Sequence, residues 1–547
     1  MSRFIVSALA AATLVAGGLA ATPVAADSAP KNVIVLIGDG MGYNHIDNAS
    51  SYLAGTTRWQ VEWDPASFTG GELGGTPSQE FETWNRVSQQ TFPVTGSYDP
   101  KAAWSDFNWV KKHPTDSAAA GTALATGVKT INGYLGVDAY GKAQETIAER
   151  AKRLGKSAGV VSSVPFSHAT PAAYVAHNIS RNNYHDIATE MIASDMDVII
   201  GAGHPHFDDS NQAAVANYKY VNEADFTALK QGKTDFSFLE TTAELTALAS
   251  GETPERVFGL PQVASTLQQS RAGESTVPFD VANNDVPDLP TLTAGALNVL
   301  DNNDEGFFLM VEGGAIDWTG HANDEVRNIE ETVDFFDAVS TVSQWVEANS
   351  SWEETLVIVT ADHETGYLVG PESDPAFDAM TGNKGEVPKL SWHSGDHTNM
   401  LVPVFFKGAG AATLAAHATG EDPVRGAFLD NTALANFLLE DLWRAAEPTE
   451  EPTEQPTEAP TEAPTEQPTE APTEQPTEAP TEQPTAEPSE KPTHDAKPLP
   501  IGPKQPGKPI ASAPKMPVTG GELIMLALLA SGLISSGVVL VRRRQAS

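Results

Sequence analysis

Six short runs of mainly apolar residues, rich in valine and isoleucine, recur along this chain. They span residues 33–37, 157–163, 198–200, 307–312, 355–360 and 402–406, with helix-like stretches such as residues 145–154 between them. Strands that are apolar along their whole length are typical of parallel sheets buried on both faces. The pattern predicts an α/β fold, a three-layer sandwich with a central, mostly parallel sheet. Residues 205–290 have weak periodicity and many turn residues, which indicates an insertion or lid.

The amino end has the order of a signal peptide. A basic residue, Arg3, precedes an apolar run over residues 4–20, and the small residues 24–26 follow. A basic start, an apolar middle and a small-residue exit are shared by export signals. We therefore predict a cleaved signal peptide over residues 1–26. The alternative is a buried helix or an uncleaved anchor.

The carboxyl end carries a second apolar segment, residues 523–541, followed by the arginines at 542–544. This segment is about long enough to cross a bilayer as a helix. Basic residues beyond a membrane span stay on the cytoplasmic side. The sequence thus predicts a transmembrane helix with the body of the protein outside the cell.

A repeat of Pro-Thr-Glu with one spacer residue fills positions 447–484. Proline at every fourth position prevents a regular helix and a central strand. The repeat has no aromatic or large aliphatic side chain with which to build a core. Residues 447–515 are predicted to form a disordered, extended stalk, with a plain disordered tail as the alternative.

Between this stalk and the apolar segment stands Met516-Pro517-Val518-Thr519-Gly520. It resembles the Leu-Pro-any-Thr-Gly sorting signal of Gram-positive surface proteins, from which it departs at Met516. The resemblance implies that residues 516–547 form a sorting signal, and that a sortase cleaves after Thr519 and joins the chain to peptidoglycan. The expected location is the cell surface, anchored to the wall, or to the membrane if the signal is not cleaved.

Composition excludes several classes of function. The chain has no cysteine, so neither thiolate metal ligands nor a cysteine nucleophile is available. Its formal net charge is −39, with 72 acidic against 33 basic residues. Nucleic-acid binding depends on a basic surface and is therefore not expected.

Polar residues follow several of the predicted strands directly. Asp39 stands between two glycines after the first run, Glu312 ends the fourth run, and Asp362 and His363 follow the fifth. Ligands of open α/β sheets bind beyond the carboxyl ends of the strands, so these side chains are expected to share a site. For each residue alone, a turn or a solvated charge is the simpler interpretation.

Two further histidines lie near acidic residues. Asp317 and His321 are four apart, so they share one face if that turn is helical. His397 precedes the last apolar run. Imidazole and carboxylate are the ligands that zinc takes when no thiolate is present. His393 is an alternative to His397, whereas His204 and His206 are interpreted as loop residues.

Ser117 opens a run of small, helix-prone residues that extends to residue 126. A helix N-terminus attracts anions through its dipole and free N–H groups. The simpler alternative is that Ser117 only caps this helix.

Taken in order, these motifs resemble the alkaline phosphatase family over residues 31–406 and, more weakly, over residues 431–443. The resemblance implies a catalytic domain at residues 27–446, two zinc ions, one magnesium ion, and hydrolysis of phosphate monoesters through a phosphoseryl intermediate on Ser117. Homodimers are common in the family and are a further expectation. The implied site residues are Asp39, Asp362 and His363 for one zinc, Asp317, His321 and His397 for the other, Asp39, Thr170 and Glu312 for magnesium, and Arg181 for the phosphate.

Two positions depart from some bacterial members of the family. His168, a candidate magnesium ligand, stands where those members have aspartate, and Trp318 stands where they have lysine. The departures bear on magnesium affinity and on the pH optimum rather than on the reaction. A phosphodiesterase of the same superfamily and an inactive surface adhesin are the alternative functions.

Overall fold

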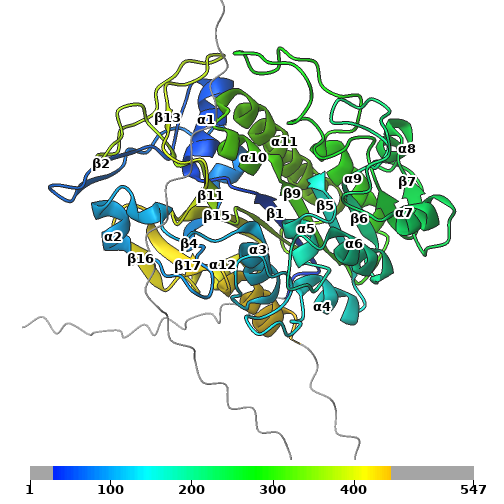
Figure 1. Ribbon diagram of the computed structural model, residues 1–547. Coiled ribbons are helices and arrows are strands. Elements are labelled where there is room, and N and C mark those ends of the chain that lie inside the picture. Colours follow the sequence, from blue (N-terminus) through cyan, green and yellow to red (C-terminus); the bar gives the residue numbers. More distant parts are fainter. Residues whose placement is uncertain (1–28, 445–547) are drawn as a thin grey trace, which may run out of the picture. The chain divides into compact units, whose positions relative to one another are not determined.

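The computed structural model describes residues 29–444 (Figure 1). The predicted signal peptide, stalk, sorting signal and transmembrane segment lie outside these residues. None of the helices within residues 29–444 combines the length and apolar character that a bilayer span requires.

An eleven-stranded sheet forms the centre of the fold. Its strands, in spatial order, are β16 (Gly420–Asp422), β17 (Gly426–Asp430), β4 (Asn85–Gln90), β15 (Val402–Gly408), β10 (Thr355–Thr360), β1 (Asn32–Gly38), β9 (Phe307–Gly313), β5 (Ser157–Pro165), β6 (Val198–Ala202), β8 (Val257–Gly259) and β7 (Ser237–Leu239). From β10 through β7 every neighbouring pair is parallel, and β15 pairs antiparallel with β10 and β4. Each of the six predicted runs forms one of these strands.

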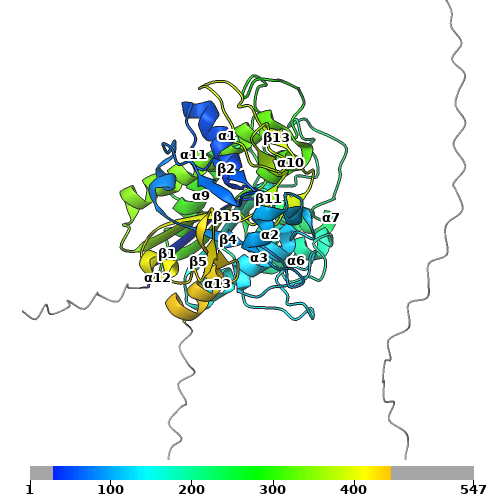
Figure 2. The same cartoon turned by 90° about the vertical axis from the view of Figure 1, so that its left-hand side faces the viewer.

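Helices cover both faces of the sheet because its strands are apolar on both sides. In β1, Val33, Val35 and Ile37 pack into one core cluster, while Ile34 and Leu36 pack into another. Figure 2 shows the two helical layers on opposite sides of the strands. The first layer contains α3 (Ser117–Thr126), α4 (Ile147–Arg153), α5 (Ala169–Ala173), α6 (Tyr184–Ala193), α7 (Glu223–Lys230), α12 (Ala411–Ala415) and α13 (Ala433–Asn436). The second contains α1 (Tyr43–Ala54), α8 (Thr242–Ala247), α9 (Leu289–Leu300), α10 (Ala315–Ala322) and α11 (Glu325–Asn349). The predicted α/β sandwich is confirmed.

Three small sheets lie outside the central one. They pair β2 (Val61–Asp64) with β3 (Thr69–Glu72), β11 (Glu364–Thr365) with β14 (His397–Thr398), and β12 (Leu368–Val369) with β13 (Ser391–Trp392). A third apolar cluster, which includes Trp63, Trp104 and Phe377, packs near the short helix α2 (Pro100–Ser105).

The segment 205–290 differs from the insertion or lid expected. It contributes β7 and β8 to the edge of the central sheet, and α7 and α8 pack on opposite faces of that sheet. Both strands are only three residues long. Strands this short carry too little alternation for a periodicity signal.

The register of the central strands decides where the site forms. Ile37 of β1 lies opposite Glu312 of β9 on one side and Thr360 of β10 on the other. The parallel strands β10, β1, β9 and β5 therefore end at one edge of the sheet. The polar residues that follow them meet there.

Candidate metal centre and active site

Three strand ends supply the buried core of the site. Asp39 follows β1, Glu312 lies near the end of β9, and Asp362 and His363 follow β10. None of these four side chains is more than 1% exposed. Nε2 of His363 lies 3.2 Å from Oδ2 of Asp362 and 3.4 Å from Oδ1 of Asp39. Asp39, Asp362 and His363 thus form one group that could hold a metal ion.

Helix α10 and the small sheet β11–β14 supply a second group. Asp317 and His321 both lie on α10, with Oδ1 and Nε2 3.4 Å apart, so the predicted i,i+4 pair is confirmed. Strand pairing of Thr365 with His397 brings His397 to the same place. Its Nε2 lies 3.3 Å from Oδ1 of Asp317 and 3.1 Å from Nε2 of His321.

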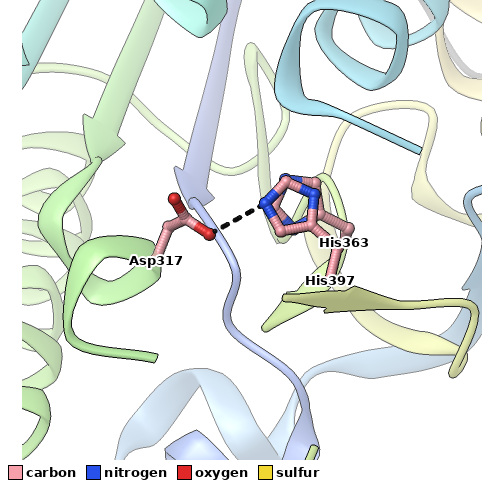
Figure 3. A group of neighbouring side chains, drawn as sticks. All are labelled: Asp317, His363 and His397. Atoms are coloured by element: carbon pink, nitrogen blue, oxygen red, sulfur yellow. Dashed lines mark ion pairs between the residues drawn. The ribbon is translucent and has the colours of Figure 1, made fainter. Parts of the chain in front are cut away.

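The two groups touch through stacked imidazoles. The rings of His363 and His397 have centroids 3.6 Å apart and planes 20° apart. Figure 3 shows both rings facing the carboxylate of Asp317. Asp317, His363 and His397 accordingly form a potential metal-binding group of their own. A further group joins His321 and His397 to Asp396, which the sequence analysis did not single out.

Ser117 is the first residue of α3 and does not cap it. The cap is Asp116, whose Oδ1 accepts a 2.9 Å hydrogen bond from the backbone N of Ala119. The capping interpretation of Ser117 is therefore wrong. Its side chain is free for another role, and its Oγ lies 3.2 Å from Nε2 of His363. Ser117 is only 2% exposed.

Asp116, which precedes this serine, also holds Arg181. Nη1 of Arg181 donates a 3.1 Å hydrogen bond to Oδ2 of Asp116. The backbone N of Gly133 donates to the same oxygen, while the backbone N of Arg181 donates to the carbonyl of Gly133. One carboxylate thus ties the start of α3 to the guanidinium.

The two predicted magnesium-site residues after β5 have different surroundings. Thr170, in α5, donates a 3.3 Å hydrogen bond to Oδ2 of Asp39. His168 belongs to none of the potential metal-binding groups within residues 29–444, and its Nδ1 has no hydrogen-bond partner there. Its ring instead packs against Tyr184 and Trp318. The role of His168 as a ligand stays a prediction.

Buried like charges dominate the first group. Burial, together with the charge of neighbouring carboxylates, raises the pKa of Asp39 well above its usual value. The same two causes raise the pKa of Asp362 to about 6, and burial raises that of Glu312 to about 7 despite a hydrogen bond from Ser162. One oxygen on each carboxylate, Oδ1 of Asp39, Oε1 of Glu312 and Oδ2 of Asp362, is buried without a hydrogen-bond partner. Bound cations would satisfy these oxygens, so the donor set fits metal ions.

The second group has the opposite charge balance. Burial opposes ionisation of Asp317, but contact with His397 and the charges of the nearby histidines hold the pKa of Asp317 far below its usual value. Burial likewise opposes protonation of His397, yet contact with Asp317 raises the pKa of His397 to about 9. The protein alone therefore holds a proton where a cation could bind.

Two histidines considered in the sequence stay apart from these groups. His393 packs edge-on against Phe107 and belongs to none of the potential metal-binding groups of the described chain. His204 lies 3.0 Å from Oε2 of Glu240, in keeping with its interpretation as a loop residue.

Sequence reasoning missed several residues that position the site. Thr365 contacts Asp317 and His363, Ser162 donates to Glu312, and Asp116 holds Arg181. A hydroxyl or carboxylate beside a predicted ligand was the only available signal, and such residues are common in turns.

The fold and this site define a class of protein: an α/β protein with a serine at a helix N-terminus beside a candidate metal centre. Comparison with known proteins narrows the class. A family model described as alkaline phosphatase matches residues 30–391, and the chain belongs to that family. Residues 445–479 and 464–500 match a second model, described as a PT disordered repeat.

Several bacterial alkaline phosphatases are among the relatives. Alkaline phosphatase 4 of Bacillus subtilis is 33% identical over 359 residues, which cover 64% of this chain and 65% of the relative. The match to alkaline phosphatase 3 of the same organism covers 63% of that protein, so the chain spans less than two thirds of both. The alkaline phosphatase of Escherichia coli is 31% identical over 422 residues, which cover 71% of this chain and 83% of the relative. In structure, the alkaline phosphatase of the Antarctic bacterium TAB5 aligns with a TM-score of 0.52 and 25% identity, over 76% of this chain and 98% of that one.

Proposed function

We propose that this chain is a metal-dependent alkaline phosphatase that hydrolyses phosphate monoesters. The observation that carries the proposal is the position of Ser117. Its Oγ lies at the start of α3, 3.2 Å from Nε2 of His363, in a site where Asp39 and Asp362 each have a buried oxygen without a hydrogen-bond partner. A serine that only stabilised the fold would not need unpartnered carboxylate oxygens in its site.

The donors suit two zinc ions and one magnesium ion. Asp39, Asp362 and His363 would hold one zinc, and Asp317, His321 and His397 the other, because zinc accepts mixed nitrogen and oxygen ligands. Magnesium prefers oxygen, which Asp39, Thr170 and Glu312 offer. A histidine-to-glutamate variant of the TAB5 enzyme is described with magnesium bound in its M3 site.

The bound ions would supply Lewis-acid chemistry, favouring the alkoxide of Ser117 and offsetting the charge of the phosphate. Oγ of Ser117 then attacks phosphorus, the bond from phosphorus to the ester oxygen breaks, and a phosphoserine forms while the ester oxygen takes a proton from water and leaves as the alcohol. Water hydrolyses the phosphoserine and releases phosphate. Arg181 binds two phosphoryl oxygens through its planar fork, which favours monoesters because a diester lacks one of these charged oxygens.

We also propose that the protein works outside the cell, anchored to the wall. The signal-peptide pattern at residues 1–26, the repeat after residue 446 and the sorting-signal resemblance ending at Gly520 support this location. Cell fractionation tests it: muramidase treatment should release the protein from the wall. Recovery in the cytosol would contradict the anchor. Homodimer formation stays a prediction, which sedimentation analysis of the purified body can test.

The activity is tested with the purified full chain, in which residues 27–446 form the predicted catalytic domain. Rates on a nitrophenyl phosphate monoester and on the matching diester are compared, before and after EDTA. The monoester should be preferred, EDTA should abolish the activity, and zinc with magnesium should restore it. Preference for the diester would contradict the substrate class, and activity resistant to EDTA would contradict the metal dependence.

A further inference from the structure

A cavity of about 270 Å³ opens next to Arg181, the residue proposed to clamp the phosphate. The chain passes directly from Arg181 into its wall, so the cavity begins one residue after the guanidinium that would hold the phosphate. It is lined by Asn182, Asn183, Tyr184, His185, Asp186 and Lys219. Five of these residues surround the start of α6, and Lys219 comes from the segment 205–290.

A row of aromatic rings connects this cavity with the metal-binding groups. Trp318 follows Asp317 on α10 and packs edge-on against His168, with centroids 5.8 Å apart. The ring of His168 is nearly parallel to that of Tyr184, at 15° and 6.4 Å. Tyr184 in turn packs edge-on against Tyr220 at 5.1 Å. These ring contacts link α10, which carries Asp317, to Tyr184 in the wall of the cavity.

Lys219 is fixed at the end of this row by its two neighbours. The carbonyl of Tyr220 accepts a 2.8 Å hydrogen bond from Ser167, and the carbonyl of Tyr218 lies 2.6 Å from Nε2 of His185. Nζ of Lys219 donates to the hydroxyl of Tyr220 at 2.8 Å and lies 4.6 Å from the centre of its ring.

The charge of Lys219 has no carboxylate partner in the described part of the chain: no ion pair joins it to an acidic side chain within residues 29–444. Lys219 lines the same cavity as Asn182, the residue that directly follows Arg181. In a chain with a net charge of −39, a cation without a carboxylate partner in the cavity next to Arg181 favours a second anion.

We propose that this cavity is a subsite for the leaving group, and that Lys219 favours phosphate monoesters whose leaving group carries a second phosphate. The proposal rests on the proposed function and extends it from phosphate monoesters in general to one preferred class. Asp186 lines the same cavity and opposes a second anion, so the preference reflects the balance of Lys219 over Asp186.

The test uses the metal-loaded full chain and two matched substrates, glucose 6-phosphate and glucose 1,6-bisphosphate. Lys219→Gln should lower kcat/KM for the bisphosphate by about threefold to fivefold, the range of an exposed ion pair, and leave the value for glucose 6-phosphate unchanged. Lys219→Arg should retain the wild-type ratio, and Asp186→Asn should increase it. The effect should fade as the salt concentration rises. Lys233→Gln removes the same charge from an exposed position of the same segment and is the control.

The possible results distinguish a failure of the proposed subsite from a failure of the proposed phosphatase function. An unchanged ratio in Lys219→Gln, an equal loss for both substrates, or the same change in Lys233→Gln would overturn the subsite while leaving the phosphatase assignment intact. A wild-type protein that hydrolyses neither substrate nor nitrophenyl phosphate would overturn the proposed function and the subsite with it.

Discussion

The hydroxyl of Thr365 donates a 2.6 Å hydrogen bond to Oδ1 of Asp317. The same hydroxyl oxygen lies 3.2 Å from Nδ1 of His363. A hydroxyl has one proton, so an oxygen that donates to Asp317 can only accept from the imidazole, which places the ring proton on Nδ1. Nε2 of His363, the nitrogen that faces Ser117, then keeps its lone pair. Thr365 thus orients one residue of each proposed zinc site.

Replacing Thr365 with valine should weaken zinc binding. Valine keeps the shape of the side chain but loses both contacts, and loss of such a partner lowers metal affinity by about 10–100-fold. Zinc dissociation constants measured by competition with a chelator check this. Thr365→Ser keeps the hydroxyl and should stay within a few-fold of wild type. Equal weakening in the serine and valine variants would show that packing, rather than the hydroxyl, is responsible.

Ser117→Ala should abolish monoester hydrolysis and leave the metal content intact. The variant loses the nucleophile, which lowers kcat by on the order of 10³-fold or more, while Asp39, Asp362 and His363 remain. Phosphate release and zinc content are measured on the same sample. Ser340→Ala, at an exposed position of α11, is the matched control. Full activity in Ser117→Ala would remove this serine from the reaction.

Arg181→Lys should raise KM and lower kcat/KM by about 10–100-fold. Lysine keeps the charge but cannot bind two phosphoryl oxygens at once, nor fit the hydrogen bond to Asp116 in the same geometry. Steady-state kinetics with a monoester, together with inhibition by inorganic phosphate, measure the loss. Arg256→Lys is the control, because Arg256 bonds to the carbonyl of Met196 instead. Unchanged phosphate inhibition in Arg181→Lys would contradict the clamp.

Glu331→Gln should stabilise the protein increasingly as the pH rises. Glu331 is 4% exposed, and its Oε1 has no hydrogen-bond partner. Burial, followed by the charge of Asp334, raises the pKa of Glu331 to about 8. The folded state then keeps a proton that the unfolded state releases at about pH 4.3, so wild-type stability falls between these two pH values.

Glutamine needs no proton and removes this penalty, which should be on the order of 1–3 kcal/mol at pH 8 and smaller at pH 6. Urea unfolding of the metal-loaded protein at the two pH values measures the difference. Glu347→Gln, at an exposed position of the same helix, should change stability little. A gain that is equal at both pH values would show that the carboxyl does not titrate as described.

Much of the fold follows from local patterns. The six apolar runs could be predicted as strands because each is long enough, or apolar enough, to be recognised from its own sequence, as β1 and β10 show. The edge strands β7 and β8 were not recognised, because three residues carry no usable periodicity. The proposed roles of the site residues and the boundaries of the outer segments remain predictions.

The sequence by itself determined which side chains could act together: residues after strand ends share an edge of the sheet, and Asp317 and His321 share a helical face. Only the tertiary structure decided which atoms meet. Ser117 and His363 are 246 positions apart, yet their side chains lie within hydrogen-bond distance. The capping of α3 by Asp116, which frees Ser117, and the bridge formed by Thr365 likewise depend on packing between distant segments. Local periodicity fixes the direction of a side chain along its own element, whereas the distance to a partner depends on how separate elements pack.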